Sequence, residues 1–176
     1  MTIGANAIPQ DIWQAQVAID VRYINFVGVI RSGTIEVNQA VHHDVEAFFE
    51  HALSLGFPIE LVASASYCEW DDERLMRDNI SSGFNYRTIV GKTTLSPHAY
   101  GMAFDINPRR NPYIRYEDGN EIVAPSGATW DPSQPGTLNA KHPLVKLMLD
   151  RGWEWGGNWG VADGRVDYQH FVKLMQ

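Results

Sequence analysis

The stretch from Ser96 to Asn107 contains a histidine and an aspartate, His98 and Asp105, seven positions apart. Imidazole nitrogen and carboxylate oxygen are both zinc ligands, and a catalytic zinc keeps one coordination position open for water. A second histidine, His170, lies near the C-terminus in the segment from Asp167 to Phe171. We therefore expect His98, Asp105 and His170 to hold a zinc ion for metal-assisted hydrolysis.

Asp167, three positions before His170, offers a carboxylate beyond the three ligands. It could act as a general base on water and later return the proton to the leaving amine. The alternative is a carboxylate that only orients a histidine ring. Because residues three apart point to opposite faces of a regular strand, Asp167 and His170 can face one metal only if the backbone bends. We predict irregular backbone at Tyr168-Gln169.

The composition is that of one globular domain. The 176 residues are 44% hydrophobic and 20% charged, a length and composition that can build a sizeable core. The net charge of −7 argues against nonspecific binding to nucleic acid or to an anionic membrane, because both require concentrated Lys and Arg. We expect an N-terminal extension over residues 1–17, a single domain over residues 18–176, and a monomer.

Neither a membrane span nor an export signal is expected. No run of about 18 apolar residues occurs, and the segment from Met1 to Gln10 has neither the basic part nor the apolar part of a signal peptide. Cys68 is the sole cysteine, so no intramolecular disulfide can form, and we expect it to be a buried small hydrophobe with no thiol chemistry. The compartment is left open.

The N-terminal half predicts a hairpin followed by a helix. Residues 18–27 alternate as a half-buried strand, and a second strand over residues 34–37 is expected after a turn at Arg31-Ser32-Gly33. A helix is expected over residues 39–55, with Asn38 as N-cap and Gly56 as its stop. It carries His42, His43 and His51, which could suggest a metal site, but no carboxylate pattern completes them, and we interpret them as surface residues.

The rest of the chain predicts shorter elements. Strands are expected over residues 59–64 and 101–106, and helices over residues 71–81 and 143–151. One face of the strand at 101–106 is nearly bare except for Asp105, which allows close approach of a ligand. Residues 107–139 are rich in Pro, Gly, Asn and Asp. We expect an ordered excursion over the site with a hairpin near Asp118-Gly119-Asn120, the alternative being a floppy insertion.

Taken together, these motifs resemble the VanX/VanY family of zinc D-alanyl-D-alanine peptidases, which includes phage L-alanyl-D-glutamate endolysins. The matching pieces are the stretch from Ser96 to Asp105, the tract from Gly152 to Trp159, and the segment from Asp167 to Phe171, with residues 81–87 similar to the family's upstream arginine segment. They occur in the family's order. The strand from Val21 and the segment Phe57-Pro58-Ile59 extend the similarity over most of the chain.

The resemblance implies an α+β fold of the hedgehog/DD-peptidase type, with an antiparallel sheet, helices on one side and the zinc site on the sheet. His98, Asp105 and His170 would be the zinc ligands. Arg87 would stabilise the oxyanion, although an arginine in a loop can equally form a structural ion pair, and Ser96 would bind substrate. VanX-like members carry glutamate at the position of Asp167. The resemblance therefore does not determine which peptide bond is cut.

The expected function is therefore a zinc metallopeptidase acting on peptidoglycan stem peptides at the cell envelope, a D-alanyl-D-alanine carboxypeptidase. One alternative is an endopeptidase that cuts L-alanyl-D-glutamate or a crossbridge. Another is a non-catalytic cell-wall-binding domain that keeps zinc as a structural staple. The six tryptophans favour core positions, but Gly156-Gly157 beside Trp155 and Trp159 suggests that one of these two rings lines the cleft and binds substrate.

Overall fold

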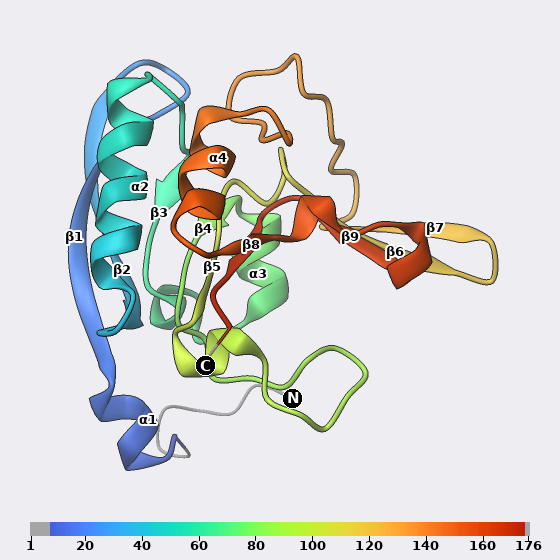
Figure 1. Cartoon of the computed structure of the whole chain (residues 1–176), viewed down its shortest axis with the longest axis horizontal. Helices are drawn as coiled ribbons and strands as arrows, with labels where there is room; N and C mark the ends of the chain where they lie inside the picture. The colour runs from blue at the N-terminus through green and yellow to red at the C-terminus, as the bar shows by residue number, and fades with distance from the viewer. Residues whose placement is uncertain (1–7, 175–176) are drawn as a thin grey trace.

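The computed structural model describes residues 8–174, so residues 1–7 of the expected N-terminal extension lie outside the described part. The chain forms an α+β fold, as predicted (Figure 1). The α-helices are α1 (Gln10–Gln14), α2 (His42–Ser54), α3 (Asp72–Arg77) and α4 (Pro143–Asp150). The strands are β1 (Gln16–Ile24), β2 (Ile30–Asn38), β3 (Leu61–Val62), β4 (Ile80–Ser81), β5 (Ala103–Asp105), β6 (Tyr113–Glu117), β7 (Asn120–Ala124), β8 (Glu154–Trp155), β9 (Arg165–Asp167) and β10 (His170–Val172).

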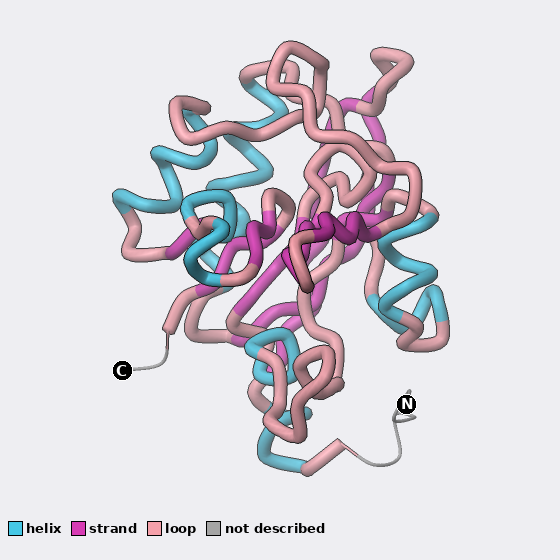
Figure 2. Tube along the Cα trace, turned by 90° about the vertical axis from the view of Figure 1, so that its right-hand side faces the viewer, coloured by secondary structure: helices cyan, strands magenta, loops and turns pink. Residues whose placement is uncertain are grey.

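The described strands divide among four small sheets instead of forming one. Three sheets are antiparallel, in the orders β1-β2, β5-β10-β8 and β7-β6-β9, and β3 and β4 form a parallel pair. The strands run through the centre of the molecule, with helices on both sides and loops across the top (Figure 2). The division has a local cause, since β9 and β10 are separated by a turn and pair with different neighbours.

The main core lies between the β1-β2 hairpin, α2, α4 and the β5-β10-β8 sheet. Buried and exposed residues alternate along most of strand β1, as predicted. The rings of Phe48 on α2, Phe104 on β5 and Phe171 on β10 meet with centroids 5.1 to 5.5 Å apart. These aromatic contacts tie α2 to the two strands that carry Asp105 and His170.

Several boundaries in the N-terminal half differ from the prediction, including the helix expected over residues 71–81, which ends at Arg77 and is followed by β4. The hairpin turns at Asn25, whose side-chain oxygen accepts from the backbone N–H of Val27 and Val29, and Gly33 lies within β2. A Cβ at Gly33 would come 2.3 Å from the carbonyl oxygen of Val62, so this glycine serves the close approach of β3 and not a turn.

Helix α2 begins later than predicted, after Val41. Asn38 is still the last residue of β2, and its side chain accepts from the backbone N–H of Ala40 in a turn that precedes the helix. The predicted stop is in place, because Gly56 follows the helix with a φ of 65°.

The long segment after β5 is ordered, as expected, and contains the predicted hairpin as β6 and β7. Two buried asparagines fasten it. The amide of Asn107 donates to the carbonyls of Pro58 and Gly136, and the amide of Asn111 donates to Gly136 while its oxygen accepts from the N–H of Leu138. Among the described residues, no helix is both long and apolar enough to cross a membrane.

Candidate active site

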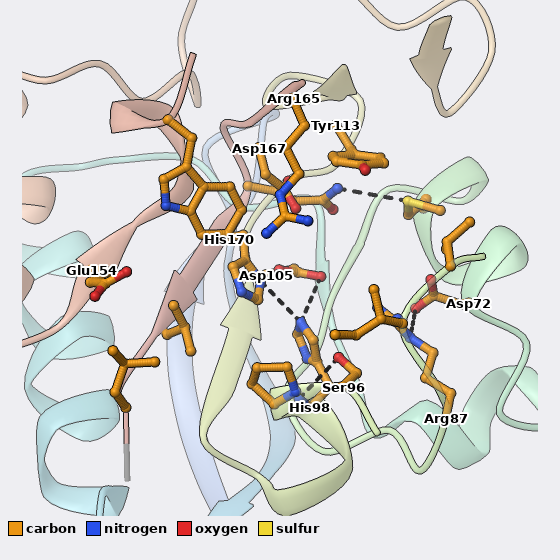
Figure 3. Close-up of a pocket in the computed structure, with 18 residues that line it drawn as sticks. Asp72, Arg87, Ser96, His98, Asp105, Tyr113, Glu154, Arg165, Asp167 and His170 are labelled. Atoms are coloured by element: carbon orange, nitrogen blue, oxygen red, sulfur yellow. Dashed lines mark hydrogen bonds and ion pairs between the residues drawn. The ribbon is translucent and has the colours of Figure 1, made fainter. Parts of the chain in front are cut away.

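The three predicted ligands converge in the structure. His98 Nε2 lies 3.3 Å from Asp105 Oδ2 and 3.1 Å from His170 Nδ1, and His170 Nδ1 lies 3.0 Å from Asp105 Oδ1 (Figure 3). Two ligands bound tetrahedrally to zinc at about 2.1 Å lie roughly 3.4 Å apart. The spacing and the donor types therefore fit a metal ion that accepts two imidazoles and one carboxylate.

A short 3-10 helix, Pro97–Tyr100, positions His98. Ser96 caps this helix, because its hydroxyl accepts from the backbone N–H of His98. His98 Nδ1 lies 2.7 Å from the carbonyl oxygen of Gly83, which can only accept, so Nδ1 carries the proton and donates. The other nitrogen, Nε2, is thereby left as the one that faces Asp105 and His170.

Strand pairing positions the other two ligands. Asp105 on β5 and His170 on β10 are directly opposite partners of an antiparallel pair, and such partners project from the same face of a sheet. Burial would raise the pKa of Asp105, but the facing imidazoles of His98 and His170 outweigh this effect and hold that pKa well below its usual range. Asp105 is therefore a carboxylate at neutral pH, the form that binds a metal ion.

Asp167 faces the same cavity, from a different sheet. It ends β9, and Tyr168-Gln169 form a turn before β10 begins, which confirms the predicted irregular backbone. Its Oδ1 atom is shielded from solvent and has no hydrogen-bond partner among the described residues. Burial raises the pKa of Asp167 to about 7, and the negative charge of Asp105 contributes to the rise. A carboxyl group with this pKa can both take and give a proton near neutrality.

The cavity around these residues has a volume of about 350 Å³ and is open to solvent. This volume falls within the range of small-ligand sites. The four residues described above lie in its wall together with residues from β6, β8, α3 and the loop before the 3-10 helix Pro97–Tyr100. The arrangement combines a metal-binding group, a nearby carboxyl that is not one of the ligands, and room for a small peptide segment.

Residues 90–173 match a family model described as D-alanyl-D-alanine carboxypeptidase. This part of the chain, just under half of its length, is thus similar to that family of peptidases. The matched segment includes His98, Asp105, Asp167 and His170, whereas Arg87 lies just before it. No curated protein and no solved structure matches the chain.

Three of the four remaining predicted site residues line the cavity of the peptidase: Arg87, Ser96 and Trp159. Trp155 does not. Its ring is buried, its Nε1 donates to the carbonyl oxygen of Tyr168, and a Cβ on Gly157 would meet this ring at 2.3 Å. Trp155 thus supports the turn after Asp167 from behind, and Trp159 is the tryptophan in the cavity wall.

Arg87 forms an ion pair with the first residue of α3. Its Nε lies 2.8 Å from Asp72 Oδ1, and both side chains are only partly exposed, 21% and 25%. The amide of Asn85 also donates to Asp72. In Figure 3 the guanidinium of Arg87 faces Asp72, across the cavity from Asp167. The ion pair expected as the alternative role of Arg87 is therefore present, and it holds the arginine in the cavity wall.

The cavity of the peptidase also contains residues that sequence reasoning missed, namely Asp72, Tyr113, Arg165 and Gln169. The position of one of them, Arg165, could have been predicted from the sequence. Arg165 precedes Asp167 by two positions, so the alternation of a strand would have placed both on one face. The position of Tyr113 could not have been predicted, because Tyr113 enters the site through the pairing of β6 with β9, where it lies opposite Asp167.

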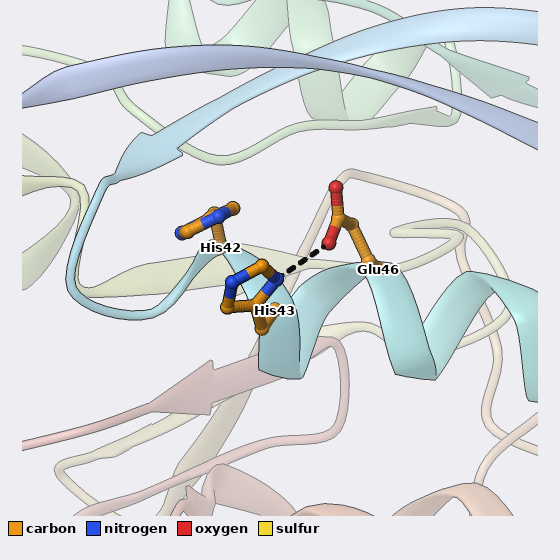
Figure 4. Close-up of side chains that lie close together, drawn as sticks. All are labelled: His42, His43 and Glu46. Atoms are coloured by element: carbon orange, nitrogen blue, oxygen red, sulfur yellow. Dashed lines mark hydrogen bonds and ion pairs between the residues drawn. The ribbon is translucent and has the colours of Figure 1, made fainter.

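A second group of possible metal ligands, His42, His43 and Glu46, lies at the start of α2 (Figure 4). His43 Nδ1 is 2.9 Å from Glu46, its side chain is 81% exposed, and His42 Nδ1 is 2.7 Å from the carbonyl oxygen of Gln39. The positive end of the helix dipole disfavours a cation here. His43 is exposed and His42 is partly exposed, in line with the predicted surface position, but the expectation that no carboxylate accompanies them is wrong, because Glu46 does. Cys68 is buried, as predicted.

Proposed function

We propose that this peptidase is zinc-dependent and hydrolyses peptide bonds in the stem peptides of peptidoglycan, as a D-alanyl-D-alanine carboxypeptidase. The observation that carries the proposal is the buried group of His98, Asp105 and His170 beside a carboxyl, Asp167, with an unpaired oxygen. The family match over residues 90–173 supports the reaction class and a role on the cell wall.

His98 Nε2, His170 Nδ1 and the Asp105 carboxylate would hold the zinc ion. When bound there, zinc polarises a carbonyl and lowers the pKa of a water molecule towards neutrality. The chain fixes the ligands beforehand, because the hydrogen bond to Gly83 orients His98 and strand pairing orients Asp105 against His170. This preorganisation avoids the cost of arranging the ligands during the reaction.

Asp167 is the general base and acid in this proposal. Its carboxylate takes a proton from the attacking water and then gives it to the nitrogen of the leaving amine, so the side chain returns to its starting form. In the metal-free protein burial raises the pKa of this carboxyl to about 7, so the group can gain and lose a proton near neutral pH. The alternative role, in which Asp167 only orients a ligand, is not favoured, because no hydrogen bond joins its Oδ1 to a histidine among the described residues.

We assign the remaining roles to the cavity wall. Arg87, held by Asp72, stabilises the negative charge that develops on the scissile carbonyl oxygen. Trp159 provides an apolar surface for the peptide. The buried Ser96 hydroxyl is close enough to the cavity to bind substrate while it caps the helix of His98. The relation to the hedgehog-type fold, the single domain over residues 18–176 and action at the cell envelope belong to the same proposal.

Two other functions compete. An endopeptidase that cuts L-alanyl-D-glutamate or a crossbridge would use the same residues, and the aspartate at the base position is its supporting feature. A non-catalytic domain that keeps zinc as a staple would have no use for a carboxyl with a raised pKa in the cavity. The unpaired oxygen of Asp167 therefore favours an enzyme over a binding domain.

The test is digestion of purified muropeptides, with and without a chelator, followed by mass spectrometry. A carboxypeptidase removes one terminal D-alanine from pentapeptide stems, and the chelator abolishes this loss. An endopeptidase instead separates the stem at L-alanyl-D-glutamate or opens a crosslink. Zinc binding without cleavage of any muropeptide would contradict an enzymatic function.

A further inference from the structure

Arg165 and Asp167 lie on the same strand, β9, two positions apart, and both line the cavity. Val166 between them is buried on the other side, as the alternation of a strand requires. In Figure 3 the Arg165 side chain descends from the rim beside Asp167 towards Asp105. The residue that we propose as the base thus has a cationic neighbour about 6.6 Å along the strand.

The Arg165 guanidinium is held in place but not neutralised. Its central carbon lies 4.7 Å from the centroid of the Trp159 ring, a cation–π distance. Its Nε is shielded from solvent and has no hydrogen-bond partner among the described residues. Within the same described part of the chain, Arg165 forms no ion pair with a carboxylate, whereas Arg87 and Arg115 are paired with Asp72 and Glu117.

We propose that Arg165, stacked on Trp159, binds the α-carboxylate of the substrate residue that leaves with the amine. This inference rests on the proposed peptidase function and names the chemistry that its substrate must carry. Planar guanidinium groups pair with carboxylates through two parallel hydrogen bonds, and a buried unsatisfied donor is costly until such a partner arrives. The Arg165 guanidinium lines the cavity, stacks on Trp159 and has no carboxylate partner among the described residues, and these features fit this requirement.

The position next to Asp167 determines which carboxylate is bound. Asp167 must reach the nitrogen of the leaving amine, and an α-carboxylate is separated from that nitrogen by a single carbon atom. Arg165, which lies beside Asp167 on the same face of the strand, is therefore placed close to this α-carboxylate. A terminal D-alanyl-D-alanine bond and an L-alanyl-D-glutamate bond both place a free α-carboxylate there, from the chain end in one case and from glutamate in the other.

The two arginines of the cavity would then have separate tasks. Arg87, on the opposite wall and paired with Asp72, acts on charge that develops during the reaction. Arg165 acts on a charge that the substrate already carries. Loss of Arg165 should therefore raise KM and remove the preference for a carboxylate, whereas loss of Arg87 should mainly lower kcat.

The experiment compares zinc-loaded wild-type enzyme with the variants Arg165→Gln and Trp159→Leu on matched peptides. One pair is diacetyl-L-lysyl-D-alanyl-D-alanine and its C-terminal amide, and the other is L-alanyl-D-glutamate and L-alanyl-D-isoglutamine. Arg115→Gln is the matched control, because Arg115 lies opposite Arg165 on β6 but is paired with Glu117. A binding arm titrates the intact peptides into zinc-loaded Asp167→Asn protein, with and without Arg165→Gln, by calorimetry.

In the wild type and in Arg115→Gln, the carboxylate form should be favoured over the amide by about ten- to a hundred-fold, the strength of a charge-assisted hydrogen bond. Arg165→Gln should reduce this ratio to about two or less while leaving the affinity for the amide unchanged, and Trp159→Leu should reduce it partly. The peptide pair that shows the preference identifies the source of the carboxylate.

Equal use of carboxylate and amide by the wild type, or an undiminished preference in Arg165→Gln, would overturn the inference. If Arg165→Gln does not fold, the wild-type comparison and Trp159→Leu still test the inference, because equal use of the two forms by the wild type or an undiminished preference in Trp159→Leu would overturn it. Failure of the proposed function looks different: no peptide is hydrolysed, yet the binding arm still reports whether Arg165 recognises the carboxylate.

Discussion

Asp167 ends one sheet and His170 begins another, and the two-residue turn between them directs both side chains into the same cavity. A continuous strand would have placed them on opposite faces. The turn is supported by Trp155, whose Nε1 donates to the carbonyl oxygen of Tyr168. The juxtaposition of the proposed base and a proposed metal ligand is thus a property of the backbone and not of side-chain rotamers.

The first prediction concerns Asp167 and pH. With the metal removed by a chelator, the folded protein holds a proton on Asp167 up to about pH 7, whereas the unfolded chain releases it near pH 4. The unfolded state therefore binds fewer protons between these values, and the free energy of unfolding should fall as pH rises through this window, by at most about 4 kcal/mol. Urea unfolding of the chelated protein at pH 4.5 and pH 8 measures the change.

The control for that experiment is Asp167→Asn, which cannot ionise. In this variant, residue 167 should no longer lower the free energy of unfolding as pH rises from 4.5 to 8. The variant should therefore be more stable than the chelated wild type at pH 8. Parallel pH curves for the two proteins would show that the Asp167 carboxyl is not buried in a way that raises its pKa.

The second prediction concerns Asp44, which fastens α2 to the C-terminal part of the chain. Its carboxylate accepts from Lys173 Nζ at 2.7 Å, Trp153 Nε1 at 2.9 Å and Arg151 Nη1 at 3.1 Å. Burial raises the pKa of Asp44, but these three donors outweigh it, so the pKa lies below its usual value. Asp44→Asn should lower the free energy of unfolding at pH 7 by about 1–3 kcal/mol.

The pH dependence of this effect follows from the lowered pKa. The stabilisation is present above about pH 4 and is lost as pH falls through the folded-state pKa. The wild type and Asp44→Asn should therefore converge in stability at low pH, which thermal unfolding at pH 7 and pH 2.5 measures. A constant difference at both values would contradict the assignment.

The third prediction separates the two views of Arg87. If its charge stabilises the oxyanion, Arg87→Gln should lower kcat by about 10²- to 10³-fold with little change in KM. Asp72→Asn, which removes its partner at 2.8 Å, should lower kcat less, because the arginine is present but less well held. An Arg87→Gln enzyme with unchanged kcat and reduced thermal stability would assign the residue to structure alone.

Much of the candidate metal site could be predicted from the sequence, because it depends on residue type and short spacing. His98 and Asp105 are close in the chain, and the need for a bend between Asp167 and His170 follows from strand geometry. The pairing of β6 with β9 could not be predicted, since it joins segments about 50 residues apart with no spacing rule between them. Tyr113 enters the cavity only through this pairing.

The errors in the predicted fold have similar causes. The sequence around Gly33 predicts a turn, yet the missing side chain of Gly33 allows a close contact with Val62, which is remote in sequence. Trp155 and Trp159 could not be told apart, because the side of the chain on which each ring falls depends on the short strand β8 and the 3-10 turn after it. The division of the strands into four sheets also depends on turns, and turns have no repeating sequence pattern from which strand pairing could be predicted.

We propose that His98, Asp105 and His170 hold a metal ion and that Asp167, which is not a ligand, acts as the base in hydrolysis. The most direct measurement determines bound zinc and muropeptide turnover in parallel for wild type, Asp167→Ala and His170→Ala. Asp167→Ala should keep about one zinc per chain and lose roughly 10²- to 10⁴-fold in turnover, whereas His170→Ala should lose both. An active Asp167→Ala enzyme, or a His170→Ala protein that keeps its zinc, would contradict the account.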